Sequence, residues 1–144
     1  MISLGDESFA FGQMLEFPEY AFFDLRRSSD TLPGPENVVT NPVLLRLWVM
    51  ARAHSKGRWP KIGFAPITPE LGKKVLRLKQ DPLKPSSILL TYDGVSGQAC
   101  DAEECRDYER AAVWDPEHVE DRLRDHFAGR PNKWVESLRV RRTA

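Results

Sequence analysis

The chain has 144 residues, in which 21 lysine and arginine residues balance 21 aspartate and glutamate residues, and 41% of the chain is hydrophobic. This length and composition predict one globular domain over residues 1–144, large enough to bury a core without metals or disulfides. No stretch approaches the roughly 20 apolar residues of a membrane span, and the first residues lack the basic and apolar segments of a secretory signal. We therefore expect a cytoplasmic protein without a membrane partner.

The neutral net charge is the sum of blocks of opposite sign. Residues 41–79 contain nine basic residues and one acidic residue, whereas residues 80–128 contain twelve acidic and five basic residues. Such blocks can create opposed surface fields that steer a charged partner, although solvated faces folded against each other are the favoured interpretation. Residues 139–144, which include three arginines, are expected to form a frayed basic tail.

The first half of the chain has the residue patterns of β-strands. Larger residues alternate with small ones over residues 8–13, and Pro18 separates this run from an aromatic-rich segment over Tyr20–Leu25. Together these two segments predict a hairpin. Three prolines, a glycine and several small polar residues predict a loop from Ser28 to Pro42.

Further short elements are expected between this loop and residue 100. The alternation over residues 43–53 predicts a strand, although the spacing of Leu44, Leu45, Trp48 and Val49 also suits a helix. The other expected elements are a turn at Lys56-Gly57, one helical turn from Thr68, strands over residues 73–78 and 87–92, and a tight turn at Asp93-Gly94.

Helix signals gather in the last third of the chain. Asp101 and Glu104 have the spacing of a reciprocal cap, which predicts a helix from about Ala102 to Val113. Asp115-Pro116 begins a second helix and Gly129 ends it; its apolar stripe consists of Val119, Leu123 and Phe127. Strands followed by helices predict an α+β fold, in which an N-terminal antiparallel sheet of about five to seven short strands is packed by two or three C-terminal helices.

No pattern indicates a reaction centre. Cys100 and Cys105 would form an irregular zinc site with His118 and His126, so two buried structural thiols are favoured. The two histidines are too far apart on one helix to share a metal ion, and packing or capping is favoured over a pH-sensitive interface. The chain has neither a Gly-x-Ser-x-Gly elbow nor a phosphate-binding loop. We expect no enzymatic activity, no catalytic or metal-ligating residues and no cofactor.

A basic segment over residues 52–79 surrounds Trp59. Basic side chains interleaved with an aromatic residue can grip a nucleic-acid backbone and stack a base, so a nucleic-acid-binding or regulatory module is a second hypothesis. A solvated sheet face is favoured, because nucleic-acid binders usually carry a clear basic excess. Trp48, Trp114 and Trp134 are expected to be core anchors. Trp59 is either an interface aromatic or, as we favour, packed under its loop.

Several spaced segments match one family in their order along the chain. They are Trp59-Pro-Lys-Ile62-Gly63, Pro66-Ile67, Lys79-Gln80-Asp81-Pro82, and the series Glu104-Cys105, Glu109, Val113-Trp114-Asp115, His118 to Leu123, His126, Gly129, Pro131-Asn132 and Trp134-Val135. Over roughly residues 5–138 the chain resembles the immunity protein 26 family of bacterial polymorphic toxin systems, and the helical series is the more specific half. The resemblance implies a non-enzymatic protein that binds and neutralises the catalytic domain of a cognate toxin. It assigns no contact residues.

The acidic block suggests how a toxin could be contacted. If the toxin is a nuclease, Glu103, Asp107, Glu117 and Asp121 could imitate phosphates against a basic cleft, with Trp59 as an interface aromatic. If the toxin is acidic, the basic segment around Trp59 becomes the better candidate.

Overall fold

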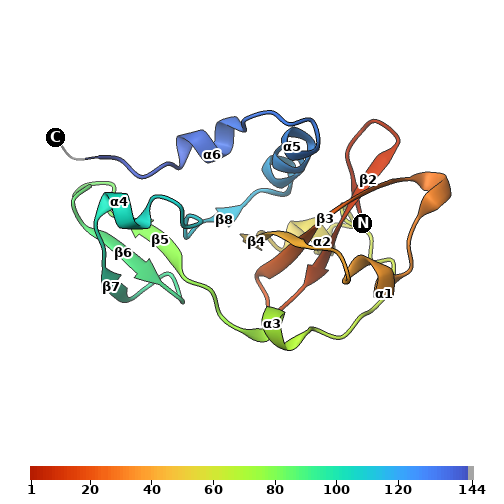
Figure 1. Ribbon diagram of the computed structural model, residues 1–144, viewed down its shortest axis with the longest axis horizontal. Helices are drawn as coiled ribbons and strands as arrows, with labels where there is room; N and C mark the ends of the chain where they lie inside the picture. Colours follow the sequence, from red (N-terminus) through yellow and green to blue (C-terminus); the bar gives the residue numbers. More distant parts are fainter. Residues whose placement is uncertain (143–144) are drawn as a thin grey trace. The chain divides into compact units, whose positions relative to one another are not determined.

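The computed structural model describes residues 1–142, which divide into two compact units. The larger unit comprises residues 1–72 and 113–132, and the smaller unit comprises residues 73–112 and the described residues from 133 on. Each unit has its own sheet (Figure 1). The α+β class is therefore confirmed, although the strands form two sheets instead of one. The single-domain organisation expected over residues 1–144 stays a prediction.

The larger unit is built on a sheet that has five strands within residues 1–142, in the order β1-β2-β3-β4-β8. Neighbours among the first four strands are antiparallel, which confirms the predicted hairpin, and β8 pairs in parallel with β4. This late strand brings the chain back to the sheet that its first residues form. The strands are β1 (Ile2–Ser3), β2 (Ser8–Met14), β3 (Glu19–Ser28), β4 (Val43–Val49) and β8 (Val113–Trp114).

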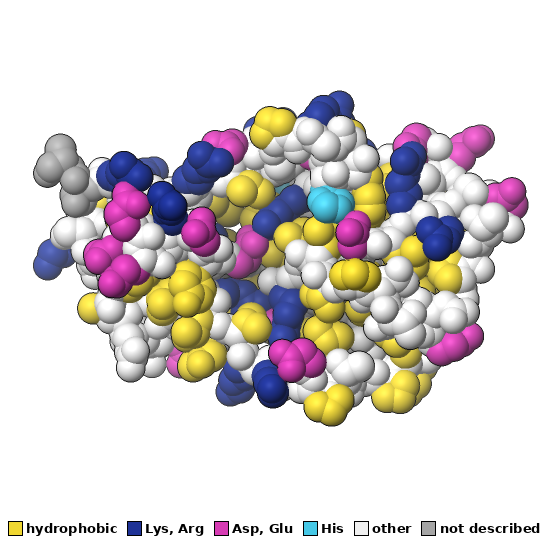
Figure 2. All heavy atoms as spheres, viewed as in Figure 1, with side chains coloured by type: hydrophobic (Ala, Val, Ile, Leu, Met, Phe, Trp, Pro, Cys, Tyr) yellow, Lys and Arg dark blue, Asp and Glu magenta, His cyan; other side chains and the backbone are white. Residues whose placement is uncertain are grey.

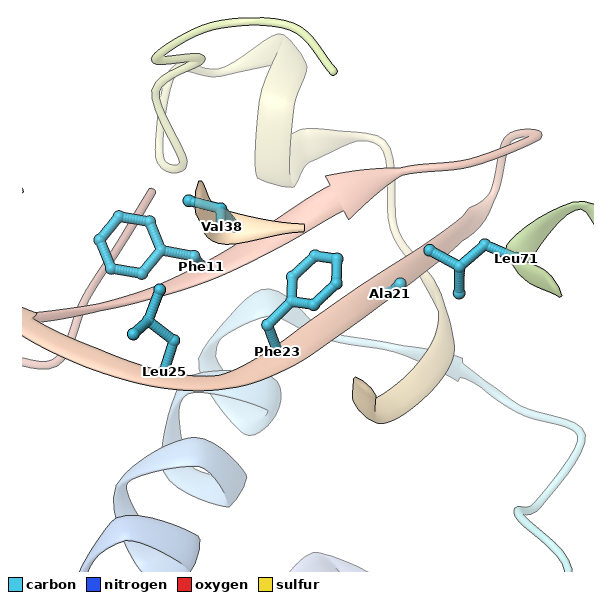
Figure 3. Packing of buried hydrophobic residues seen from close by; sticks show 6 residues of the cluster. All are labelled: Phe11, Ala21, Phe23, Leu25, Val38 and Leu71. Carbon is cyan, nitrogen blue, oxygen red and sulfur yellow. The ribbon is translucent and has the colours of Figure 1, made fainter. Parts of the chain in front are cut away.

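β3 is the central buried strand of the larger unit. Its residues from Tyr20 to Phe23 are buried without interruption, which requires cover on both faces of the sheet because successive side chains point to opposite sides. Tyr20 and Phe22 pack against the ring of Trp59, at centroid distances of 5.8 and 5.6 Å. A second cluster, shown in Figure 3, consists of Phe11, Ala21, Phe23, Leu25, Val38 and Leu71.

Short helices connect the strands of the larger unit, and one longer helix follows β8. The predicted loop after Ser28 contains two helical turns, and the strand predicted over residues 43–53 ends at Val49, where α2 follows. The helical turn predicted from Thr68 is confirmed, as is the helix between Asp115 and Gly129, where Gly129 has a φ of +66°. These elements are η1 (Ser29–Thr31), α1 (Pro35–Val38), α2 (Arg52–Ser55), α3 (Pro69–Gly72) and α5 (Pro116–Phe127).

The smaller unit packs a hairpin sheet against a short helix. Leu78, Ile88 and Cys105 form its buried cluster. The turn predicted at Asp93-Gly94 is confirmed, because Asp93 Oδ1 accepts hydrogen bonds from the amides of Val95 (2.8 Å) and Ser96 (3.0 Å). The elements are β5 (Arg77–Gln80), β6 (Ile88–Thr91), β7 (Gly97–Ala99), α4 (Ala102–Cys105) and α6 (Lys133–Ser137).

Two predicted elements of the smaller unit have wrong bounds. The strand expected over residues 73–78 begins only at Arg77, and the helix expected over Ala102–Val113 ends at Cys105. Asp101 does cap α4, accepting from the amides of Glu103 (3.0 Å) and Glu104 (2.9 Å). The helix does not continue because the backbone further on bonds to Leu78 instead, through the Glu109 carbonyl and the Ala111 amide, each at 2.8 Å.

The two cysteines are joined, so the expectation of free thiols was wrong. Cys100 and Cys105 form a disulfide across the first turn of α4, with their Cα atoms 6.3 Å apart. The turn brings the two residues together because the Cys105 amide donates to the Asp101 carbonyl. Cys105 is fully buried in the core of the smaller unit.

The basic end of the chain is described up to residue 142. Gln80 exchanges two hydrogen bonds with the backbone of Arg141, at 2.8 and 2.9 Å, and Arg142 pairs with Glu103. Residues 143 and 144 lie outside the described residues, and the frayed tail expected over residues 139–144 stays a prediction. Within residues 1–142, none of the helices is long and apolar enough to span a membrane.

Candidate partner-binding site

The start of α5 carries acidic side chains that bind an arginine of α2. Arg52 donates hydrogen bonds to Asp115 Oδ1 (2.8 Å) and Glu117 Oε1 (2.7 Å). The bonds that Arg52 donates are the main reason that the pKa of Glu117 falls to about 2, and the carboxylates of Glu117 and Asp115, which accept these bonds, raise the pKa of Arg52. Glu117 is therefore ionised at neutral pH, and much of its charge is compensated within the larger unit.

Glu120 is the buried acid of α5, with 7% of its side chain exposed. Its carboxylate accepts two hydrogen bonds from Arg58, at 2.7 and 2.8 Å, and one from the indole Nε1 of Trp59 at 2.9 Å. This arrangement attaches the turn after α2 to the helix. The sequence carries a signal for the burial of Glu120. Glu120 lies four residues after Pro116 and three before Leu123, both buried, so it falls on the apolar face.

Three of the five predicted contact residues lie in the larger unit: Trp59, Glu117 and Asp121. Glu117 and Asp121 are 42% and 40% exposed, and Asp121 pairs with Arg124 at 2.7 Å. Trp59 is only 7% exposed. It packs under its loop, the alternative that we favoured, while Trp114 is also buried and Trp48 and Trp134 are half-buried.

The other two predicted contact residues, Glu103 and Asp107, lie in the smaller unit. Asp107 is the most exposed of the set, at 90% of its side chain. Glu103 pairs with Arg106 (3.3 Å) and Arg142 (2.6 Å), and Figure 2 shows acidic and basic side chains next to one another over α4. The structure thus brings the predicted residues together as two groups, one in each unit.

The basic segment is also divided between the units, after residue 72. Arg52 and Arg58 bind carboxylates of α5, and Arg77 is buried. Lys56 and Lys61 are exposed, and neither has a charged partner among the described residues. Several of the cations that suggested nucleic-acid binding therefore stabilise the fold.

A cavity of about 310 Å³ opens in the larger unit beside the extended segment of residues 60–67, which we call the strap. Its lining comes from β1, β2, β3, α1, α2, the strap and single residues next to them, among them Trp59, and it is mainly hydrophobic. Lys61 is the lining residue with a charged side chain, and no acidic residue contributes. Four lining residues are exposed hydrophobics, namely Met14, Ile62, Phe64 and Ile67.

Few polar side chains line the cavity. Gln13 Nε2 donates to the Ala65 carbonyl at 2.8 Å and so ties the strap to β2. Its Oε1 atom is buried and has no hydrogen-bond partner among residues 1–142. The Tyr20 hydroxyl and His54 Nδ1 are 2.8 Å apart and bond to each other. The chain pattern gave no signal for this cavity, because the strap is an irregular segment without periodicity.

The remaining histidines have local partners in the larger unit. His118 Nδ1 lies 3.7 Å from Asp115 in the first turn of α5, and His126 Nε2 lies 3.0 Å from Asp24 of β3. Over residues 1–142, no three His, Cys, Asp or Glu side chains are grouped as a metal site would require.

Part of the chain is similar to a known protein family. A family model described as Immunity protein 26 matches residues 1–88. The matched part includes β1 to β4, the strap and every residue that lines the cavity. The helical series from Glu104 to Trp134, expected to be the more specific half of the resemblance, lies outside the match. No curated protein and no solved structure matches the chain.

Proposed function

The chain belongs to the immunity protein 26 family, and from this premise we propose that it binds the catalytic domain of a cognate polymorphic toxin and blocks it by stoichiometric occlusion. The family match over residues 1–88 is the observation that carries the proposal. Membership implies a non-enzymatic inhibitor with a toxin as partner. In this proposal the protein acts in the cytoplasm of the cell that produces the toxin.

The packing of the larger unit supports inhibition by a preformed surface. β3 is covered on both faces, and α5 is attached to the turn after α2 by Arg52, Arg58 and Trp59. A surface fixed in this way loses little conformational freedom on binding, which favours tight association.

Co-expression with the toxin domain encoded beside this chain tests the proposal. We expect cells that produce the toxin domain alone to stop growing, and cells that also produce this protein to grow normally. The two purified proteins should form a stable complex. Absence of both protection and complex formation would contradict the proposal.

Acidic side chains in both units are candidates for electrostatic steering of the toxin. We propose that Glu103 and Asp107 in the smaller unit, and Glu117 and Asp121 in the larger, attract a basic toxin surface. Trp59, bonded to Glu120 on the same helix as the second pair, holds that helix in place. Asp107 is the most informative position because its side chain is 90% exposed. Steering charges raise the association rate more than they slow dissociation.

Charge reversal in each unit tests this steering. The double variants Glu103→Lys/Asp107→Lys and Glu117→Lys/Asp121→Lys should associate more slowly with the toxin domain, and their rates should depend less on salt. Glu16→Lys, at an exposed acid outside both groups, is the matched control. Unchanged association kinetics in both double variants would remove the idea. An acidic toxin would instead be slowed by reversal of Arg58, Lys61 and Lys73. Lys61 and Lys73 give the cleaner test, because reversal of Arg58 also removes its bonds to the buried Glu120.

A further inference from the structure

The cavity beside the strap has the chemistry of a receptor for one apolar group. Its volume of about 310 Å³ is at the lower end of the roughly 300–1,000 Å³ of small-molecule sites, so one aromatic group fits better than a large ligand. The exposed side chains of Met14, Ile62, Phe64 and Ile67 are part of its lining. Exposed hydrophobic side chains gathered around a hollow are typical of an interaction site.

Phe64 is the strongest indication that the site faces a partner. Its side chain is 79% exposed, although it belongs to the lining of an apolar cavity. Burial of a water-exposed phenyl ring against a partner stabilises the complex. Tyr20, Phe22 and Trp59 supply aromatic surface deeper in the lining.

Two polar features narrow the identity of the occupant. The buried Gln13 Oε1 atom can accept a hydrogen bond and has no partner among the described residues, so a group with an N–H or O–H donor would satisfy it. Lys61 lines the cavity without an acidic neighbour in the lining, which favours a negative charge beside the apolar group. Tryptophan or tyrosine next to an acidic residue combines these features.

We propose that the cavity beside the strap receives a tryptophan or tyrosine side chain of the toxin, with its N–H or O–H directed at Gln13 and a neighbouring carboxylate at Lys61. This inference rests on the proposed function and names the surface through which that function acts. It also places the contact within residues 1–88, the part of the chain that carries the family match. The acidic groups steer the encounter, and the cavity holds the bound state.

Two substitutions of exposed residues test the cavity without disturbing the core. Phe64→Ser removes the aromatic surface, and Lys61→Glu reverses the charge. Each should weaken the affinity for the toxin domain about tenfold or more, mainly through faster dissociation. The matched controls are Leu83→Ser, at a side chain that is 95% exposed in the smaller unit, and Lys56→Glu, at an exposed lysine outside the cavity. Both controls should bind within about twofold of the unmodified protein.

A small probe tests the cavity without the toxin. Indole-3-acetate carries an aromatic ring, an N–H donor and a carboxylate, and 1-methylindole-3-acetate lacks only the donor. In amide NMR titrations, indole-3-acetate should shift the signals of Gln13, Lys61 and Phe64, and the methylated compound should bind several-fold more weakly. The toxin domain should compete with the probe.

The outcomes separate this inference from the proposed function. If the unmodified protein neither binds the toxin domain nor protects cells, the proposed function fails, whatever the probe does. If it binds and protects, but Phe64→Ser and Lys61→Glu bind as tightly as the controls, the cavity is not the contact and the inference is overturned. Circular dichroism and melting of each variant establish that a loss of binding is not a loss of fold.

Discussion

At the scale of single residues, Glu120 connects α5 to the rest of the larger unit. Its buried carboxylate accepts three hydrogen bonds, two from Arg58 and one from Trp59. Glu120→Ala would leave the Trp59 indole without this acceptor and Arg58 without its main partner. We expect the free energy of unfolding to fall by about 2–3 kcal/mol, because Arg58 is partly exposed and can regain water.

Urea denaturation followed by tryptophan fluorescence measures this loss. Asp121→Ala, at the next position on α5, is the matched control. The side chain of Asp121 is 40% exposed, so its removal should change the free energy of unfolding by less than about 1 kcal/mol. Equal effects of the two substitutions would show that the bonds of Glu120 do not stabilise the fold as described.

Glu117 makes the stability of the fold depend on pH in the acidic range. Bonds from Arg52 are the main cause that lowers its pKa from 4.5 to about 2. A carboxylate whose pKa is lowered by folding contributes stability at pH values above 4.5, and this contribution is lost as the pH falls towards 2. In Glu117→Gln and in Arg52→Gln, the free energy of unfolding should therefore decline less steeply over this pH range than in the unmodified protein.

Unfolding curves at a series of pH values give this comparison directly. The difference in the free energy of unfolding between the unmodified protein and Glu117→Gln isolates the contribution of Glu117 from that of other acids. One such acid is Asp93, whose pKa is also lowered to about 2 by hydrogen bonds from the Val95 and Ser96 amides. Parallel curves for the unmodified protein and Glu117→Gln would contradict the assignment.

At the scale of elements, the end of α5 depends on a glycine with a left-handed backbone. Gly129 has a φ of +66°, and a Cβ atom there would meet open space. Gly129→Ala should therefore cost about 1 kcal/mol through backbone conformation alone. Gly72 at the end of α3 also has open space but no positive φ, so Gly72→Ala should be neutral or slightly stabilising. Thermal unfolding of the pair checks this, and equal melting temperatures would refute it.

The elements that sequence reasoning predicted well are those with local signals. α5 begins at Asp115-Pro116 and ends near Gly129, and the hairpin of β2 and β3 follows from alternation around Pro18. The helix predicted over Ala102–Val113 failed after a correct cap, because the later residues bond to distant strands. Glu109 and Ala111 bond to Leu78 of β5, and Val113 pairs with Trp48 of β4, 65 positions earlier. Such long-range pairing leaves no local pattern to read.

The geometry around the proposed contact residues also depends on contacts that are distant in sequence. Local charge suggested Glu117 and Asp121 as contact residues, but it gave no indication of their bonds to Arg52 and Arg124. Burial of Trp59 depends on Tyr20, Phe22 and Glu120, which are distant in sequence. The cavity is lined by six separate elements, and only the assembled fold could reveal it.

At the scale of the whole molecule, we expect both compact units to contribute to toxin binding. The match begins at residue 1 and extends to residue 88, into the smaller unit. The larger unit holds the cavity, and acidic groups occur in both units. We therefore expect steering to depend on both units and affinity to depend mainly on the larger one.

The most direct test of the central claim is a titration of the toxin domain's catalytic activity with the purified protein. At toxin concentrations well above the dissociation constant, the activity should fall linearly and vanish at one equivalent of this protein, because each molecule occludes one active site. Full toxin activity in the presence of excess protein would contradict the account, and so would loss of activity at a small fraction of one equivalent, since that would indicate catalytic inactivation of the toxin.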